Sequence, residues 1–413
     1  MTAPFSRMGT ANSYETALRN LSARQNSLVT LQGQMSANKS VLRGSDDPTA
    51  AAAAERATTR LSRIDSEQRA LAAQRNTIQN AESTLGSVNS AIQDFRDLVV
   101  QAGSGVYNAT DRASIAQQLT SLRDQILAYA NEKDTNGQPL FGGLGSGVAP
   151  FVDGSGNVSY DAVAGQNASA GNAISNTIDG KATFMNVPTG NGVFTVDLAK
   201  DATGKVTNTG TASTDAGKVT DPSALTGNGY SISFALDAAG KTTYTVTNTT
   251  TGTAALTNQP YVAGNAIAFD GLSLTVKGNP AVGDTINVGT STTSNLFKTL
   301  DDAISTIGKA GANVGAIGQA VTNALVQLDA GLTRTSASRG YAGELLNRAD
   351  RISDVQDART TQVTSDLSVA EGSDQDSQIK RISDFQNQQT GYSAALQSYA
   401  QIQKLSLFNF IGG

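Results

Sequence analysis

The sequence has 413 residues and contains no Cys, no His and no Trp. Without Cys or His there is neither a thiolate nor an imidazole to bind a metal ion. A Cys nucleophile, a histidine general base and any disulfide are excluded as well. Among enzymes only a carboxylate-based glycosidase survives these absences, and no motif supports one. We therefore predict that the chain is not an enzyme and binds no cofactor or metal.

Long apolar runs and a strong charge of either sign are missing too. No run approaches the roughly 18 apolar residues of a membrane-spanning helix. The first residues mix Ser, Arg, Asn and Glu, unlike the apolar segment of a cleaved signal peptide. The formal net charge is −5, which disfavours nucleic-acid binding. We expect neither a membrane nor a nucleic acid as a partner.

The composition changes twice along the chain. Residues 1–137 and 294–413 are rich in Ala, Gln, Leu, Arg, Ser and Asp, whereas residues 138–293 are rich in Gly, Thr, Asn and Val. We predict a multidomain α+β protein, in which the two end segments form a long antiparallel, coiled-coil-like helical rod and the middle is a small inserted all-β domain. Two separate helical bodies would expose many Leu and Ile side chains, each at a cost of ~1.5–3 kcal/mol.

Apolar residues at every seventh position predict the core of this rod. Asp46, Asp47 and Pro48 mark a turn and a helix start, because Asp is a good N-cap and Pro suits the first helical position. From there an unbroken seven-residue repeat, typical of a supercoiled helix, continues to residue 99. A second series follows residue 294. The predicted core residues are Ile64, Leu71, Ile78, Leu85, Ile92, Val99, Ile307, Val314, Val321 and Leu328.

Four glycines interrupt the second series with a spacing that places them on one helix face: Gly308, Gly311, Gly315 and Gly318. Another helix could approach closely there; the alternative is a loop that breaks the helix over 308–318. A further helix is expected from about 108–111 to 131–136. Alternating patterns predict strands at 193–198, 230–236, 242–248, 272–276 and 284–288.

The two ends of the chain carry thin apolar stripes on otherwise polar helices. Such helices are marginally stable alone and need a partner, so we predict that the stripes are an assembly seam between chains. The seam residues are Leu18, Leu21, Leu28 and Leu31 near the N-terminus and Ile382, Phe385, Tyr392, Leu396, Tyr399, Ile402, Leu405, Leu407 and Phe408 near the C-terminus.

Motifs that resemble chemical sites have simpler interpretations here. The pairs Asp46-Asp47 and Asp301-Asp302 are interpreted as charges at helix starts. The glycine-rich stretch 142–147 lacks the Lys-Ser/Thr of a phosphate-binding loop and fits a flexible linker. Residues 153–157 distantly resemble a calcium loop but lack the following Glu, so we expect a turn.

Several segments resemble hook-associated proteins of the bacterial flagellin family, in the same order along the chain. They are Gly44-Ser45-Asp46-Asp47-Pro48-Thr49-Ala50, residues 111–116 with 122–125, residues 134–143, residues 337–352 and residues 388–410. The resemblance covers roughly the outer three-fifths of the chain. It implies terminal helices at 1–45 and 367–413 that are disordered in the monomer and coiled in the assembly. A rod of 46–137 with 294–366 and a β domain of 138–293 complete the implied organisation.

The resemblance also implies a function: a structural subunit that forms the ring between flagellar hook and filament. The implied partners are further copies in the ring, the other hook-associated junction protein, flagellin or the filament cap distally, and an export chaperone at the C-terminal helix. The implied location is the extracellular flagellum, reached by type III export without a cleaved signal peptide. The alternatives are a flagellin-type filament subunit and a surface-binding adhesin module on a flagellin-like rod.

Overall fold

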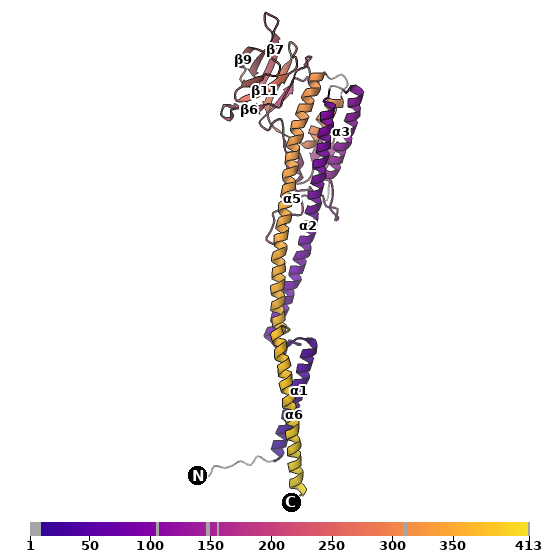
Figure 1. Cartoon of the computed structure of the whole chain (residues 1–413), viewed down its shortest axis with the longest axis vertical. Helices are drawn as coiled ribbons and strands as arrows, with labels where there is room; N and C mark the ends of the chain where they lie inside the picture. Colours follow the sequence, from indigo (N-terminus) through magenta and orange to yellow (C-terminus); the bar gives the residue numbers. More distant parts are fainter. Residues whose placement is uncertain (1–9, 105–106, 146–148, 155–156, 309–312, 412–413) are drawn as a thin grey trace. The chain divides into compact units, whose positions relative to one another are not determined.

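The computed structural model describes residues 10–104, 107–145, 149–154, 157–308 and 313–411. The chain divides into two compact units: unit 1 comprises residues 1–70 and 351–413, and unit 2 comprises residues 71–350. Long helices form the two ends of the sequence and strands its middle, so the fold is α+β, as predicted (Figure 1).

The described helices begin and end close to the expected positions. The second begins at Pro48, and the third follows directly after Asn108, whose side chain accepts hydrogen bonds from the backbone N–H groups of Thr110 and Asp111. A local cap of this kind explains why the start is visible in the sequence. The helices are α1 (Thr10–Ala37), α2 (Pro48–Ala102), α3 (Ala109–Ala130), α4 (Leu296–Gly308), α5 (Val314–Glu371) and α6 (Gln375–Ile411).

Helices α2 and α5 lie side by side and antiparallel in unit 2 (Figure 1). Arg96 Nε is 3.1 Å from Asp329 Oδ1, and Arg339 Nε is 2.6 Å from Glu82 Oε1. Residue numbers therefore increase along α2 in the direction in which they decrease along α5, so the two helices are antiparallel. The N-terminal and C-terminal helical segments thus pair with each other, as the rod prediction required.

The seven-residue repeat of α2 is buried throughout unit 2. Its members there are at most 5% exposed: Leu71, Ile78, Leu85, Ile92 and Val99. On the C-terminal side Ile307 and Leu328 are also buried and Val321 is half-buried, but Val314 is 72% exposed. The helical pattern is interrupted here, because α4 ends at Gly308, Asn313 belongs to no helix and α5 begins at Val314. Residues 309–312 lie outside the described residues. The repeat is broken there, and Val314 is not a core residue.

The glycines at this break serve two different contacts. A Cβ on Gly308 would lie 3.2 Å from Ala116 of α3, so here a helix does approach closely. A Cβ on Gly315 would lie 2.5 Å from Ala212 O, and one on Gly318 would meet Ser213. The neighbour of these two glycines is an extended segment of the β domain rather than the helix we expected. Gly311 lies outside the described residues.

The strands of the middle region form a domain with one shared apolar core. A five-stranded antiparallel sheet has the order β4-β12-β7-β8-β9, and a smaller sheet joins β10, β11, β5 and β6. Ala316 of α5 contributes to the same core. The strands are β4 (Phe194–Leu198), β5 (Ser213–Thr214), β6 (Lys218–Val219), β7 (Tyr230–Leu236), β8 (Thr242–Asn248), β9 (Ala254–Pro260), β10 (Ala266–Phe269), β11 (Leu272–Lys277) and β12 (Thr285–Thr290).

Residues 138–185 do not belong to this β core but pack on the helices. The hairpin of β1 (Phe151–Gly154) and β2 (Asn157–Tyr160) and a single π-helical turn (Lys181–Met185) supply an aromatic cluster. Phe184 lies 5.3 Å from Phe151 and 6.2 Å from Phe297 of α4, between ring centroids. The glycine-rich stretch is packed as well, because a Cβ on Gly143 would overlap Val163 O. Up to residue 145 it is not the flexible linker we predicted, and 146–148 lie outside the described residues.

The chain enters and leaves the β domain through a two-stranded neck. Strand β3 (Val187–Pro188) pairs antiparallel with β13 (Thr293–Ser294), and Val187 is the register partner of Ser294. The expected helix start at 293 or 294 is therefore a strand, and α4 begins at Leu296. Asn295 Oδ1 accepts the backbone N–H of Lys298 at 2.6 Å and caps this helix.

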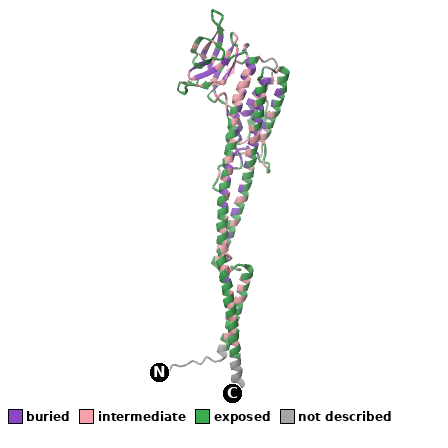
Figure 2. Cartoon of the chain, viewed as in Figure 1, coloured by how far each residue is buried: buried purple, intermediate pink, exposed green. Residues whose placement is uncertain are grey.

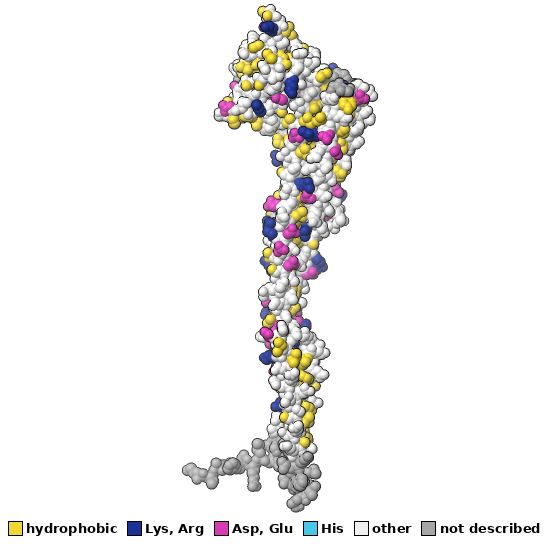
Figure 3. All heavy atoms as spheres, viewed as in Figure 1, with side chains coloured by type: hydrophobic (Ala, Val, Ile, Leu, Met, Phe, Trp, Pro, Cys, Tyr) yellow, Lys and Arg dark blue, Asp and Glu magenta, His cyan; other side chains and the backbone are white. Residues whose placement is uncertain are grey.

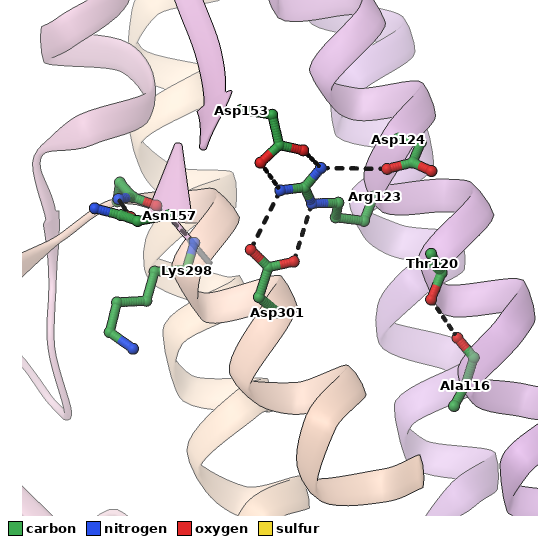
Figure 4. A network of polar contacts seen from close by, with 9 residues as sticks. Ala116, Thr120, Arg123, Asp124, Asp153, Asn157, Lys298 and Asp301 are labelled. Atoms are coloured by element: carbon green, nitrogen blue, oxygen red, sulfur yellow. Dashed lines mark hydrogen bonds and ion pairs between the residues drawn. The ribbon is translucent and has the colours of Figure 1, made fainter. Parts of the chain in front are cut away.

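A buried arginine joins three segments of unit 2 (Figure 4). Arg123 of α3 is 7% exposed, and its Nε donates to Asp301 Oδ1 of α4 at 3.0 Å. Its Nη2 donates to Asp153 Oδ1 of β1 at 3.0 Å, and its Nη1 contacts Asp153 and Asp124. We had expected Asp301 to lie in the first turn of a helix. It lies beyond the first turn of α4 and pairs with Arg123 instead. Its neighbour Asp302 pairs with Lys298 one turn earlier.

The side chain of Gln356 on α5 is buried, but its polar atoms make no hydrogen bond within the described part of the chain. It is 1% exposed, and both its side-chain amide N and O lack a hydrogen-bond partner among the described residues. An unpaired buried amide costs about 1–3 kcal/mol, so Gln356→Leu is expected to raise the free energy of unfolding by about 1 kcal/mol. Chemical unfolding followed by circular dichroism measures this. The exposed Gln362→Leu is the matched control, and an equal gain in both variants would contradict the burial argument.

Candidate functional site

The two terminal helices form an antiparallel pair in unit 1. Tyr14 and Tyr399 meet near one end, with hydroxyl oxygens 2.7 Å apart and ring centroids 5.4 Å apart. This hydrogen bond raises the pKa of Tyr399 above its usual range. Further along, Arg24 Nη1 donates to Gln388 Oε1 at 3.4 Å. The pair is thus held by polar contacts as well as by its apolar stripes.

The apolar stripes of α1 and α6 are only partly covered by this pairing. Leu18 is 43% exposed, Ile382 is 46% exposed and Leu396 is 42% exposed. The other described members are half-buried: Leu21, Leu28, Leu31, Phe385, Tyr392 and Tyr399. The side chains of Ile402, Leu405, Leu407 and Phe408 lie outside the described residues. Figure 2 accordingly shows this helix pair largely without buried residues.

Hydrophobic side chains gather on one face of the α1–α6 pair (Figure 3). Apart from the predicted stripes, further apolar residues are exposed on α1 and the segment that follows it: Tyr14, Met35 and Leu42. A helix pair that leaves such residues in water loses the stabilisation of burying them, about 25 cal/mol per Å². The arrangement fits a surface that another chain covers.

The turn between the terminal helix and the next one is built by two adjacent aspartates. Asp46 Oδ2 accepts the backbone N–H groups of Leu42 and Arg43 at 3.0 and 2.8 Å. Asp47 Oδ1 accepts those of Thr49 and Ala50, both at 3.0 Å, and Pro48 is the first residue of α2. The bond from Ala50, followed by the one from the Thr49 hydroxyl, lowers the pKa of Asp47. These carboxylates act as caps for the backbone.

Unit 2 contains a polar groove of about 1100 Å³. It is lined by β4, the 200–209 loop, α4 and α5. Each of its carboxylates is already engaged: Asp302 with Lys298 at 2.9 Å, Asp197 with Asn323 at 2.7 Å, and Asp201 with its own turn. The three carboxylates that line the groove are thus all hydrogen-bonded or ion-paired within the chain.

Two further properties concern the described part of the chain as a whole. No group of three or more metal-ligating side chains comes together among the described residues. Within the same ranges, no helix combines the length and the apolar character that a membrane span requires.

Sequence reasoning missed the polar residues that connect distant segments. Arg123, Gln356 and Arg381 are all buried, yet each stands in a polar stretch with no local feature that predicts burial. Arg123 pairs with Asp301 across 178 residues, and Arg381 with Ser40 across 341. Contacts at such separations leave no periodic pattern in the sequence.

Two family models match separate parts of the chain. The model for the bacterial flagellin N-terminal helical region matches residues 9–146. The model for a flagellar hook-associated protein 1, D2-like domain matches residues 203–290, which lie in the β domain.

Curated relatives match one part of the chain. Flagellar hook-associated protein 3 of Salmonella typhimurium is 36% identical over 147 residues, which are 35% of this chain and 46% of that protein. The chain thus spans about half the length of the curated relatives that it matches.

Solved structures resemble a larger part of this chain than the curated relatives do. The flagellar junction protein FlgL from Legionella pneumophila superposes with a TM-score of 0.65 at 27% identity, covering 72% of this chain and 99% of that one. FlgL from Xanthomonas campestris gives a TM-score of 0.67 at 25% identity, covering 76% and 99%. The chain is therefore similar over residues 9–146 to the bacterial flagellin N-terminal helical region, and it is similar in sequence and fold to flagellar hook-associated protein 3.

Proposed function

We propose that this chain is a structural subunit of the bacterial flagellum that forms the junction ring between hook and filament. The observation that carries the proposal is the pair of apolar stripes on α1 and α6, which a single chain leaves half-exposed. Stripes at helical spacing on paired terminal helices call for neighbouring copies that cover them. The similarity to hook-associated protein 3 supplies the place of assembly.

The proposed partners follow from this role. Further copies of the chain complete the ring, the other hook-associated junction protein lies on the hook side, and flagellin or the filament cap lies on the distal side. An export chaperone covers the C-terminal helix before assembly. The chain works outside the cell after type III export and catalyses no reaction.

Deletion of the gene tests the role directly. The expected result is hooks without filaments and flagellin released into the medium, because the adaptor between the two is gone. Immunolabelling of purified flagella is expected to mark only the tip of the hook. Complete filaments in the deletion strain would refute the junction role, and labelling along the whole filament would favour a flagellin-type subunit.

Substitution of the stripes tests the assembly surface. The double variant Leu18→Gln, Ile382→Gln is expected to fail to restore filaments in the deletion strain, because it places polar amides in the seam between copies. Both residues are more than 40% exposed in the single chain, so its thermal midpoint should stay unchanged. Val29→Gln, at a 63% exposed position of α1 outside the stripe, is the control and should restore filaments. Full function of the double variant would contradict the seam.

A further inference from the structure

The first turns of α5 have a sequence that forms a helix poorly on its own. Gly315 and Gly318 lie in this stretch, and glycine favours a helix less than any other residue except proline. Val314, at the first position of the helix, is β-branched and exposed. The first N–H groups of a helix also have no partner within it. The start of α5 therefore depends on the residues that pack against it.

The β domain supports the start of α5 through its capping residue. Asn313 directly precedes the helix, and its Oδ1 accepts the backbone N–H of Ala316 at 2.7 Å. The Nδ2 of the same side chain donates to Asn208 O of the β domain at 2.8 Å. Ala316 is 6% exposed and belongs to the apolar core of the β domain. The cap of α5 is thus held in place by the domain on which the helix rests.

Gln319, one turn after the cap, is buried and uses its whole side-chain amide. It is 4% exposed, and its Oε1 accepts the backbone N–H and the hydroxyl of Thr214 in β5 at 2.7 and 2.9 Å. Its Nε2 donates to Val196 O of β4 at 3.1 Å and to Asn323 Oδ1 at 3.0 Å. A primary amide offers two donors and two acceptor positions, so all four are occupied.

The two strands that Gln319 contacts are the outermost strands of two sheets. Strand β4 stands at the end of the five-stranded order, and β5 stands at the end of the smaller sheet. Outermost strands present backbone N–H and C=O groups that no further strand pairs. The amide of Gln319 accepts from the N–H of one edge and donates to the C=O of the other, as the peptide group of an intervening strand would. It thereby joins the two sheets.

The glycines that weaken the helix are what allow this contact. A Cβ on Gly315 would lie 2.5 Å from Ala212 O, a backbone atom just before β5. A Cβ on Gly318 would lie 3.3 Å from Ser213 Oγ. The start of α5 thus gives up helix propensity in exchange for close packing on β5.

We propose that residues 313–323 of α5 and the β5 edge of the β domain become ordered as one unit, with Gln319 as the positioning residue that couples them. Loss of the helix start would leave Thr214 N and Val196 O without their partner. Loss of the β5 edge would leave the Gln319 amide buried and unpaired. These contacts all lie within unit 2, so they require neither the terminal helices nor assembly with other chains.

Hydrogen–deuterium exchange of the full-length chain, read by mass spectrometry, tests the coupling. As urea is added below the unfolding midpoint, peptides that cover residues 211–219 and 314–326 should lose protection at the same urea concentration. In Gln319→Met both peptides should exchange about tenfold faster, because the side chain keeps its bulk but loses its hydrogen bonds. Gln117→Met, at an exposed position of α3 in the same unit, is the matched control and should change neither peptide.

Gly315→Ala separates docking from helix propensity, because the two predict opposite results. Alanine favours an isolated helix over glycine, so exchange at 314–326 would slow if propensity governed the start of α5. Docking instead predicts exchange about tenfold faster in both peptides, since the added Cβ meets Ala212 O. Gly340→Ala is the control on the same helix, where no described neighbour lies within 4 Å of the added Cβ, and it should speed exchange in neither peptide.

Peptides within residues 85–99 of α2 should stay protected in every variant, which distinguishes local loss from general unfolding. Should a variant unfold throughout, the urea series of the unsubstituted chain still decides. Three results would overturn the proposal: protection at 314–326 lost at a lower urea concentration than at 211–219, faster exchange in only one of these peptides in Gln319→Met, or slower exchange at 314–326 in Gly315→Ala.

Discussion

Replacing Phe184 by alanine is expected to lower the free energy of unfolding of unit 2 by about 3–5 kcal/mol. The ring is fully buried and touches three other phenylalanines, with centroids 5.5 Å from Phe141, 5.3 Å from Phe151 and 6.2 Å from Phe297. Its removal leaves a cavity between a loop, a strand and α4. Urea unfolding followed by circular dichroism measures the loss, since the chain has no Trp to report it.

Val163→Ala is the control for this cluster. Val163 belongs to the same 138–185 region but is 57% exposed, so the expected loss is below about 0.5 kcal/mol. A loss of less than about 1 kcal/mol for Phe184→Ala would mean that residues 138–185 are not packed on the helices as described.

Replacing Arg123 by methionine is expected to lower the free energy of unfolding of unit 2 by about 3 kcal/mol. The substitution leaves Asp153 and Asp301 facing each other without the cation that joins them. Their side chains are 43% and 31% exposed, so water compensates part of the loss and the value lies at the low end for a buried pair. Lys298→Met, which removes an exposed i,i+4 pair, should cost only about 0.3–0.5 kcal/mol.

The same variant should change the response to acid. The hydrogen bonds from Arg123 lower the pKa of Asp153. A carboxyl whose pKa is lower in the folded state contributes stability above the unfolded pKa of about 3.9, and this contribution disappears as the pH falls through the folded value. The stability difference between the unsubstituted chain and Arg123→Met should therefore shrink below about pH 4. A difference that is constant from pH 7 to pH 3 would contradict the pairing.

Features of the fold that depend on neighbouring residues could be predicted from the sequence. Asp47 and Asn108 cap helices through bonds to residues two and three positions later, so the residue types alone mark the starts. The hairpin of β7 and β8 follows from two alternating runs around one turn, and Leu236 indeed pairs with Thr242. The repeat in α2 could be predicted because its period depends on neighbouring turns of one helix, and its members in unit 2 are buried.

Features that depend on distant residues could not be predicted. The composition of 138–293 is uniform, yet its first third packs on α4 through Phe151 and Phe184, while the remainder forms the β core. Val314 fits the repeat, but it is the first residue of α5 and its side chain is 72% exposed. For the candidate site, the spacing of Leu18 and Ile382 indicates only that something covers them. It does not distinguish a segment of the same chain from a neighbouring copy.

The two-stranded neck of β3 and β13 has a consequence for how the chain folds. Arg123 and Asp301 are 178 residues apart, a long loop to close before α3 and α4 can meet. A β domain that forms first brings Val187 beside Ser294 and removes the stretch between them from that loop. Closure entropy falls by only about 0.6 kcal/mol per halving of length. Early formation of the inserted domain should therefore make the meeting of α3 and α4 modestly faster, and it leaves the free energy of the final fold unchanged.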